Sequence, residues 1–213
     1  MECKTFNELS HMEHGVCIFL GSGKTGKSTG LFSVAETFFP DREKYLVESY
    51  AFDNSIFPEY HIVSDVWDVP CGALCVIEDV PRVFPARKSQ SQVKLGAFLS
   101  IISHKNIVCL ASCQNSGSMD IDFMRTQRVL FFHKRVWDSD LDFERDEIKP
   151  FQVAANLALD HMVKLLPDEN PKAFTYCSNH GEILLLGLPS WWGYSQSHFL
   201  QNAVPNFGGK NDC

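Results

Sequence analysis

The sequence predicts an α/β fold, in which a mainly parallel β-sheet is flanked by helices. Two observations lead to this prediction. Apolar runs of strand length alternate along the chain with segments whose apolar residues recur at helical spacing. A glycine-rich stretch, GSGKTGKST at residues 21–29, joins the first apolar run to the first helical segment. Strands that alternate with helices form parallel sheets covered on both faces.

The predicted elements follow in a regular order. The first half of the chain contains strand 16–20, helix 27–39, and strands 45–48, 60–63 and 73–78. The next part contains helix 92–103, strand 107–112, a short helix at 119–126 and strand 128–133. An acidic segment, DSDLDFERDE at 138–147, is expected to be a solvated loop or the entry to a helix. PFQVAANLALDHMVKLL then predicts a C-terminal helix that stops at Pro167, and AFTYCS and EILLLGL predict a β-hairpin.

The glycine-rich stretch matches the phosphate-binding pattern G-x-x-x-x-G-K-[ST]. Glycines at positions 21, 23 and 26 would let successive backbone N–H groups turn toward a phosphate, and the following helix adds its unpaired N–H groups. Lys27 would reach the β- and γ-phosphates, and Ser28 would supply its hydroxyl to Mg²⁺. The predicted nucleotide-binding residues are Gly21, Ser22, Gly23, Lys24, Thr25, Gly26, Lys27, Ser28 and Thr29.

Two adjacent carboxylates follow the apolar run LCVI, in the stretch GALCVIEDV. At the end of a buried strand in a phosphate-loop fold, one acid holds Mg²⁺ and its neighbour orients and deprotonates the attacking water. We assign Glu78 to the metal and Asp79 to the water. This pair favours ATP hydrolysis over passive nucleotide binding.

The net charge of −7 is unevenly distributed. Residues 80–119 contain five basic and no acidic residues, so this segment carries +5 and the remainder of the chain carries −12. A charge run is most often a solvated face. Because this segment begins directly after the two acids, it also suggests a surface for nucleic-acid phosphates. The candidate DNA contacts are Arg82, Arg87 and Lys88.

Composition predicts one sizeable globular domain, because 45% of the 213 residues are hydrophobic. We expect an N-terminal extension at 1–14, a phosphate-loop ATPase domain at 15–189 and an aromatic tail at 190–213, which docks on this domain or on a neighbouring subunit. No apolar stretch reaches the roughly 18 residues of a membrane helix and no signal peptide is evident, so we expect a soluble intracellular protein. The eight cysteines are expected to be reduced.

A zinc site is the alternative use of the cysteines, since two C-x3-C pairs could supply four thiolates. The four candidates are Cys71, Cys75, Cys109 and Cys113. Cys75 and Cys109 fall within predicted core strands, which favours a buried hydrophobic role for these two thiols.

Four stretches in fixed order carry a resemblance to a known family: GSGKTGKS, CVIEDVPRVFPARK, SHKNIVCLASCQN and DIDFMRTQRVLFF. Together they resemble the FtsK-HerA superfamily of ring-forming DNA motors, which have a RecA-like P-loop NTPase fold, over roughly residues 15–135. Within the superfamily the chain looks most like the small viral genome-packaging ATPases, and second like the Zot-like ATPases of filamentous phage assembly.

The resemblance implies roles for individual residues. Lys27, Ser28, Glu78 and Asp79 match the nucleotide and metal positions, and Gln114 matches the sensor of the γ-phosphate. Arg125 lies where such ATPases place an arginine that reaches a neighbour's γ-phosphate. A structural salt bridge from Arg125 to Asp120 or Asp122 is the alternative, and Arg82 and Arg128 are rival candidates for the arginine finger.

The implied function is a motor that uses ATP and Mg²⁺ to move double-stranded DNA into a preformed capsid. Its expected partners are DNA, identical subunits in a ring that we expect to be a hexamer, and a capsid or membrane vertex protein. Its expected location is the cytoplasm of an infected cell or the virion. The alternative is a nucleotide-switched assembly or extrusion ATPase that does not itself translocate DNA. A small-molecule kinase would need an acceptor site and lid, for which the sequence has no clear signature.

Overall fold

The computed structural model describes residues 2–85, 89–125 and 128–205. In this part of the chain, eight strands form one sheet in the order β4-β2-β5-β6-β1-β7-β8-β9. The first six in this order are parallel: β4 (Tyr60–Val63), β2 (Lys44–Val47), β5 (Leu74–Ile77), β6 (Val108–Cys113), β1 (Gly15–Leu20) and β7 (Val129–His133). The last two, β8 (Phe174–Cys177) and β9 (Glu182–Leu185), are antiparallel. The predicted parallel sheet and C-terminal hairpin are confirmed.

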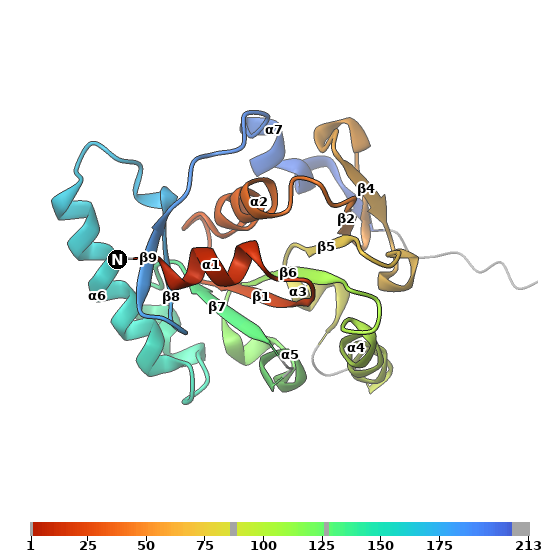
Figure 1. Cartoon of the computed structure of the whole chain (residues 1–213), viewed down its shortest axis with the longest axis horizontal. Helices are drawn as coiled ribbons and strands as arrows, with labels where there is room; N and C mark the ends of the chain where they lie inside the picture. Colours follow the sequence, from red (N-terminus) through yellow and green to blue (C-terminus); the bar gives the residue numbers. More distant parts are fainter. Residues whose placement is uncertain (1, 86–88, 126–127, 206–213) are drawn as a thin grey trace, which may run out of the picture.

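Helices cover both faces of this sheet (Figure 1). α1 (Lys4–Ser10) and α2 (Lys27–Phe38) lie over one face, and α4 (Ser89–Ile101) and α5 (Ile121–Arg125) lie over the other. Strand β1 contributes to both layers, because successive side chains of a strand point to opposite faces. Its residues 17 and 19 join the core under α2, and residues 16, 18 and 20 join the core under α4.

Helix α6 (Lys149–Leu165) covers the end of the sheet formed by β7 and β8. Its buried Gln152 contacts Nδ1 of His133 at 2.8 Å, and Ser178 Oγ lies 2.9 Å from Nε2 of the same ring. Burial lowers the pKa of His133 to about 4. This histidine is therefore a neutral, hydrogen-bonded core residue at neutral pH.

Both ends of the described chain pack on the central sheet. In the predicted N-terminal extension, α1 contributes Leu9 to the core, and Glu182 of β9 accepts hydrogen bonds from the backbone N–H and hydroxyl of Thr5. In the predicted tail, Trp191 and Trp192 contact Phe32 of α2. These contacts make both segments part of one packed unit in the described chain.

The structure also contains short elements that were not predicted. They include β3 (Tyr50–Ala51), which pairs with β10 (Val204–Pro205), helix α3 (Val80–Val83) directly after the two acids, and helices α1 and α7 (Tyr194–Ser197) near the two ends. The acidic segment forms a 3-10 helix at Asp138–Phe143. None of the helices in the described residues combines the length and the apolar character that a bilayer-spanning segment requires.

Candidate nucleotide-binding site

The glycine-rich loop connects β1 to the N-terminus of α2. Gly26 precedes the helix, and no side chain caps the helix N-terminus. Lys27 Nζ and Thr25 Oγ1 both donate to the carbonyl oxygen of Ser22, each at 2.8 Å. Burial lowers the pKa of Lys27. The loop therefore presents an ammonium group beside uncapped N–H groups, which is an arrangement that fits phosphate.

The backbone explains two of the three glycines. Gly21 and Gly26 have φ values of +152° and +92°, and a Cβ atom on either would lie within 2.8 Å of another side chain. Gly23 has no positive φ, and an added Cβ would meet no atom within 4 Å. The prediction that position 23 needs glycine for its backbone is therefore wrong. Lys24, with φ of +64°, takes the left-handed conformation instead.

The loop contacts the predicted metal-binding acid directly. Ser28 Oγ donates a hydrogen bond to Glu78 Oε1 across the gap between α2 and the end of β5. The other carboxylate oxygen of Glu78 is buried and has no hydrogen-bond partner among the described residues. Burial raises the pKa of Glu78. A hydroxyl and a carboxylate with an unsatisfied oxygen are the hard oxygen ligands that Mg²⁺ takes, so these residues fit the predicted metal.

Asp79 lies beside Glu78 in a more open position. Its side chain is 26% exposed, against 13% for Glu78. Its backbone N–H donates to Ser112 Oγ at 3.1 Å, and its φ of +64° is left-handed. Aspartate is one of the few residues that adopt this conformation with little strain. The structure thus brings the two acids together and gives them different surroundings.

Arg82 and Glu48 complete the group of charged residues. Arg82 Nη2 donates to Glu48 Oε2 at 2.8 Å and to the carbonyl oxygen of Glu78 at 2.5 Å, and Nη1 lies 3.8 Å from Asp79 Oδ2. Burial raises the pKa of Glu48, while Arg82 lowers it. Glu48 was not predicted, although it directly follows β2, whose carboxyl end lies at the same edge of the sheet as Glu78.

The acidic segment packs against the glycine-rich loop instead of being wholly solvated. Ser22 Oγ donates to Asp140 and accepts from the backbone N–H of Trp137 at 2.9 Å. Further along, buried Glu144 accepts from the N–H and the hydroxyl of Ser116 at 2.9 and 2.5 Å. These inward-facing acids hold two loops at the carboxyl edge of the sheet. No local sequence signal distinguished them from their exposed neighbours.

Lys134 links the glycine-rich loop to the C-terminal hairpin. Its side chain is buried, and Nζ donates to the carbonyl oxygens of Lys172 and Phe174 at 2.8 and 2.9 Å. Its Cβ lies where a side chain at Gly21 would project. Burial lowers the pKa of Lys134 to about 7.

A cleft of about 1040 Å³ extends from the glycine-rich loop toward the C-terminal part of the chain. We call it the nucleotide cleft. Its walls come from three parts of the chain: Lys24 and residues 26–29; Glu169, Asn170, Lys172 and Ala173; and residues 185–188 with Trp192, Gly193, Ser197 and His198. Its volume is that of a cleft that holds a small-molecule ligand.

Gln114 lies at the same edge of the sheet as the loop and the acids. It is exposed and directly follows β6, which lies between β1 and β5. Ser116, two residues later, is the residue held by Glu144. The predicted sensor is therefore on a loop that the acidic segment fixes.

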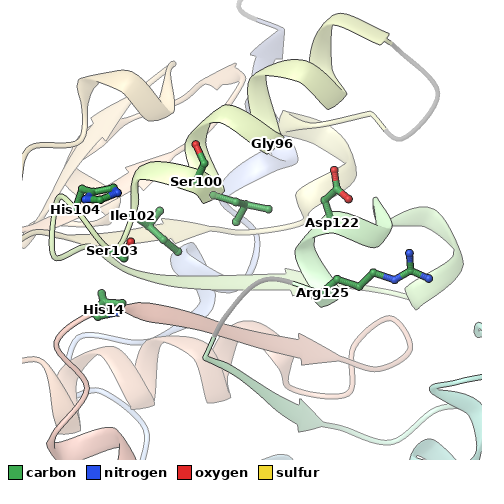
Figure 2. Close-up of a pocket in the computed structure, with 9 residues that line it drawn as sticks. His14, Gly96, Ser100, Ile102, Ser103, His104, Asp122 and Arg125 are labelled. Atoms are coloured by element: carbon green, nitrogen blue, oxygen red, sulfur yellow. The ribbon is translucent and has the colours of Figure 1, made fainter.

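Arg125 lies at the opposite edge of the sheet. It lines a cavity of about 530 Å³ with His14 and His104, which precede β1 and β6. Figure 2 shows the Arg125 side chain extending away from the two histidines. Within the described residues, no ion pair joins Arg125 to Asp120 or Asp122. Arg125 is thus at the other edge of the sheet from its own loop, and the alternative role, a salt bridge to Asp120 or Asp122, is not seen in the described residues.

The basic segment is partly neutralised. Arg82 is bound to acids in the site, and Lys94 pairs with Asp65 at 2.5 Å. The structure therefore does not leave Arg82 as a surface contact for DNA. Arg87 and Lys88, the other two candidate DNA contacts, lie outside the described residues.

The cysteine candidates for zinc lie mostly in the core. Cys75 and Cys109 are paired in register on neighbouring strands and are buried, as is Cys113, while Cys71 is exposed. In residues 2–85, 89–125 and 128–205, no three His, Cys, Asp or Glu side chains form a group that could hold a metal ion.

Comparisons with known proteins agree with this fold. No family model matches the sequence, and no curated protein matches it either. The genome packaging NTPase B204 of Sulfolobus turreted icosahedral virus 2 is similar in structure, with TM-scores of 0.52 for its sulfate complex and 0.50 for its AMPPCP complex. The identities are 13% and 12%, and each match covers 83% of this chain and 98% of B204.

Two other solved structures are also similar. EssC (ATPases 2 and 3) from Geobacillus thermodenitrificans matches with a TM-score of 0.50 and 10% identity, over 89% of this chain and 42% of that one. The N-terminal domain of zonular occludens toxin from Neisseria meningitidis has a TM-score of 0.42 and 16% identity, over 56% and 76% of the two chains. B204 and EssC share the fold of this chain, an α/β fold with a mainly parallel sheet flanked by helices, as the order of strands and helices predicted.

Proposed function

We propose that this chain hydrolyses ATP and uses the energy to move double-stranded DNA through a ring of identical subunits, packaging a viral genome into a capsid. The observation that carries the ATPase part is the hydrogen bond from Ser28 to Glu78, with Asp79 at the next position. A phosphate loop alone supports nucleotide binding. The adjacent carboxylates add the groups that hydrolysis requires.

Each residue of the site has a distinct task in this proposal. The N–H groups at the start of α2 bind the β-phosphate, and Lys27 compensates the charge of the β- and γ-phosphates. Ser28 and Glu78 would hold Mg²⁺, which neutralises charge on the phosphate oxygens when it is bound. Asp79 accepts the proton of the attacking water, and the amide of Gln114 orients that water beside the γ-phosphate.

The DNA part of the proposal has two supports. One is the fold shared with B204, a genome packaging NTPase that binds the ATP analogue AMPPCP. The other is the excess of basic residues in the segment 80–119. With Arg82 engaged by Glu48, we assign the phosphate contacts of this segment to Arg87 and Lys88.

The decisive measurement is ATP turnover with and without double-stranded DNA at low salt. We expect DNA to stimulate turnover, and Lys27→Ala to abolish it in a folded protein, because the ammonium group lies at the loop and not in the core. Neutralising Arg87 and Lys88 together should weaken DNA binding for all sequences. It should also lower the slope of log affinity against log salt by about 0.9 for each DNA phosphate that is no longer neutralised.

A matched control removes two lysines elsewhere, through Lys149→Ala and Lys164→Ala on α6, and should leave the slope unchanged. Wild-type turnover in the Lys27→Ala variant would refute the ATPase assignment. If DNA leaves turnover unchanged while a protein partner raises it, the chain is a nucleotide-switched assembly ATPase and not a motor.

A further inference from the structure

The lining of the nucleotide cleft extends past the phosphate-binding loop and includes large apolar side chains. Beyond Lys27 and Ser28, the cleft is lined by Leu185, Leu188 and Trp192. We propose that these three side chains bind the aromatic base of the nucleotide. This inference rests on the proposed function, because it assigns the part of ATP that the loop does not hold.

The two leucines are unusually exposed for their position. Leu185 ends β9 and is 45% exposed, and Leu188 follows it at 51%. The intervening Leu186 is buried in the core, and its N–H donates to the carbonyl of Ala173 at 3.2 Å. The backbone is therefore fixed while two large apolar side chains face a cleft. Covering them with a flat heteroaromatic ring would remove this apolar surface from water.

Trp192 packs against α2, the helix that follows the phosphate-binding loop. Its ring centroid lies 5.2 Å from that of Phe32, and Phe32 is on α2, five residues after Lys27. The backbones of Lys27 and Phe32 are therefore separated by a helix rise of about 7.5 Å. A single bound nucleotide can contact both ends, with its phosphates at Lys27 and its base at Trp192.

The segment that leads into β8 also lines the cleft and supplies polar groups at a fixed position. Asn170 and Lys172 line the cleft, and Asn170 Oδ1 accepts the N–H of Lys172 at 3.0 Å. The carbonyl of Lys172 is in turn bound by buried Lys134. This segment is therefore held in place by the buried Lys134 side chain, which suits it to hydrogen bonding with the ribose or the edge of the base, while the leucines contact the face of the base.

The test compares two ligands that share the phosphates and differ in the base. We expect Leu188→Asn to weaken ATP binding about tenfold, since less apolar surface would cover the base, and to leave the binding of inorganic tripolyphosphate unchanged. Leu157→Asn is the matched control, because Leu157 is an exposed leucine of α6 outside the cleft. In wild type, photolysis of bound 8-azido-ATP should label a peptide that contains residues 185–192.

The outcomes separate this inference from the proposed function. If Lys27→Ala abolishes binding of both ligands but Leu188→Asn affects neither and the photolabel lies elsewhere, the base site is wrong and the ATPase assignment survives. If Leu188→Asn instead changes only the oligomeric state, the base site is equally wrong, and the leucines belong to an interface between copies of the chain. If wild type binds neither ATP nor tripolyphosphate, the proposed function fails, and the base site fails with it.

Discussion

Glu78 and Asp79 are adjacent in the chain, but their side chains have different surroundings. Glu78 is the more buried of the two and accepts the Ser28 hydrogen bond, so one of its oxygens already faces the predicted metal ligand. Asp79 is more exposed and lies 3.8 Å from Arg82. These surroundings favour Glu78 as the metal-holding acid and Asp79 as the base. The backbone also explains why aspartate is the second acid of the pair and glutamate the first. The left-handed conformation at position 79 is less strained for the shorter aspartate side chain.

We expect the amide variants of these two acids to differ in phenotype. Asp79→Asn keeps the shape and removes the base, so the protein should bind Mg-ATP with wild-type affinity and lose at least about 100-fold in turnover. Glu78→Gln should raise the Mg²⁺ concentration needed for half-maximal turnover. Titration of Mg²⁺ at saturating ATP measures both effects.

Exchanged phenotypes would exchange the two roles. Ser112→Ala provides a control for simple structural damage, because it removes the acceptor of the Asp79 N–H and leaves both carboxylates in place. Its Mg²⁺ requirement should remain that of the wild type. A raised Mg²⁺ requirement in this control would mean that backbone displacement, and not removal of a metal ligand, explains the Glu78→Gln result.

At the level of elements, the Lys134 side chain connects the end of β7 to the C-terminal hairpin. Its amine is buried, and burial disfavours the charged form of this group. Its pKa is about 7 in the folded chain and near 10.5 when unfolded. Between these values the unfolded state binds more protons, so this lysine makes stability rise with pH, by about 1.4 kcal/mol per unit. Below about pH 7 both states are protonated and the dependence disappears.

Lys134→Met should remove this pH dependence while keeping the length of the side chain. We expect the free energy of unfolding of wild type, measured by urea titration, to rise relative to that of the variant by about 2.5 kcal/mol between about pH 7.5 and 9.5. Lys164→Met, at an exposed position on α6, should show no such trend. A pH-independent difference between wild type and Lys134→Met would mean that Lys134 is not held as a depressed-pKa amine.

The elements differ in how readily the sequence predicts them. Strands β1, β5 and β6 are fully buried and mostly apolar because both faces of the sheet are covered, and this pattern is local. Strands β3 and β10 have two residues each, too few for any periodicity, and they form only where the tail pairs with the segment after β2 in a small separate sheet. Prediction therefore works where the determinant of an element is contiguous in the chain.

The same distinction applies to the site. The loop, Glu78 and Asp79 were predictable because each belongs to a contiguous motif. Asp140 and Lys134 were not, since each reaches the loop only after distant segments pack together. A lysine that follows a strand is ordinarily exposed, and nothing near position 134 indicates that its ammonium group binds two carbonyls in the core. Tertiary contacts, not local sequence, position these residues.

At the scale of the whole molecule, Arg125 cannot serve its own loop without crossing the sheet. If it serves a neighbour, Arg125→Ala protein should bind ATP normally and lose at least about 10³-fold in turnover, because such an arginine stabilises charge in the transition state. Mixing it with Lys27→Ala subunits should restore part of the activity, since some interfaces then pair an intact loop with an intact arginine. Turnover of the mixture against each variant alone is the measurement.

Arg128, which directly precedes β7, is a rival candidate for the arginine finger, so Arg128→Ala is the comparison variant for this experiment. If mixed rings form and the Arg125→Ala mixture regains nothing, the arginine acts only within its own subunit. Rescue with Arg128→Ala instead would transfer the role to that residue. Disappearance of the rings themselves would show that Arg125 supports assembly and not catalysis.

The separation of the glycine-rich loop and Arg125 to opposite edges of one sheet also constrains symmetry. A twofold interface brings the same patch of both subunits together, so it cannot contain both edges of a single sheet at once. An interface between a loop edge and an arginine edge is therefore head-to-tail, and each added subunit presents the same two unlike surfaces again. An open row would leave one loop at its end without an arginine. Only a closed circle of subunits would give every loop a partner.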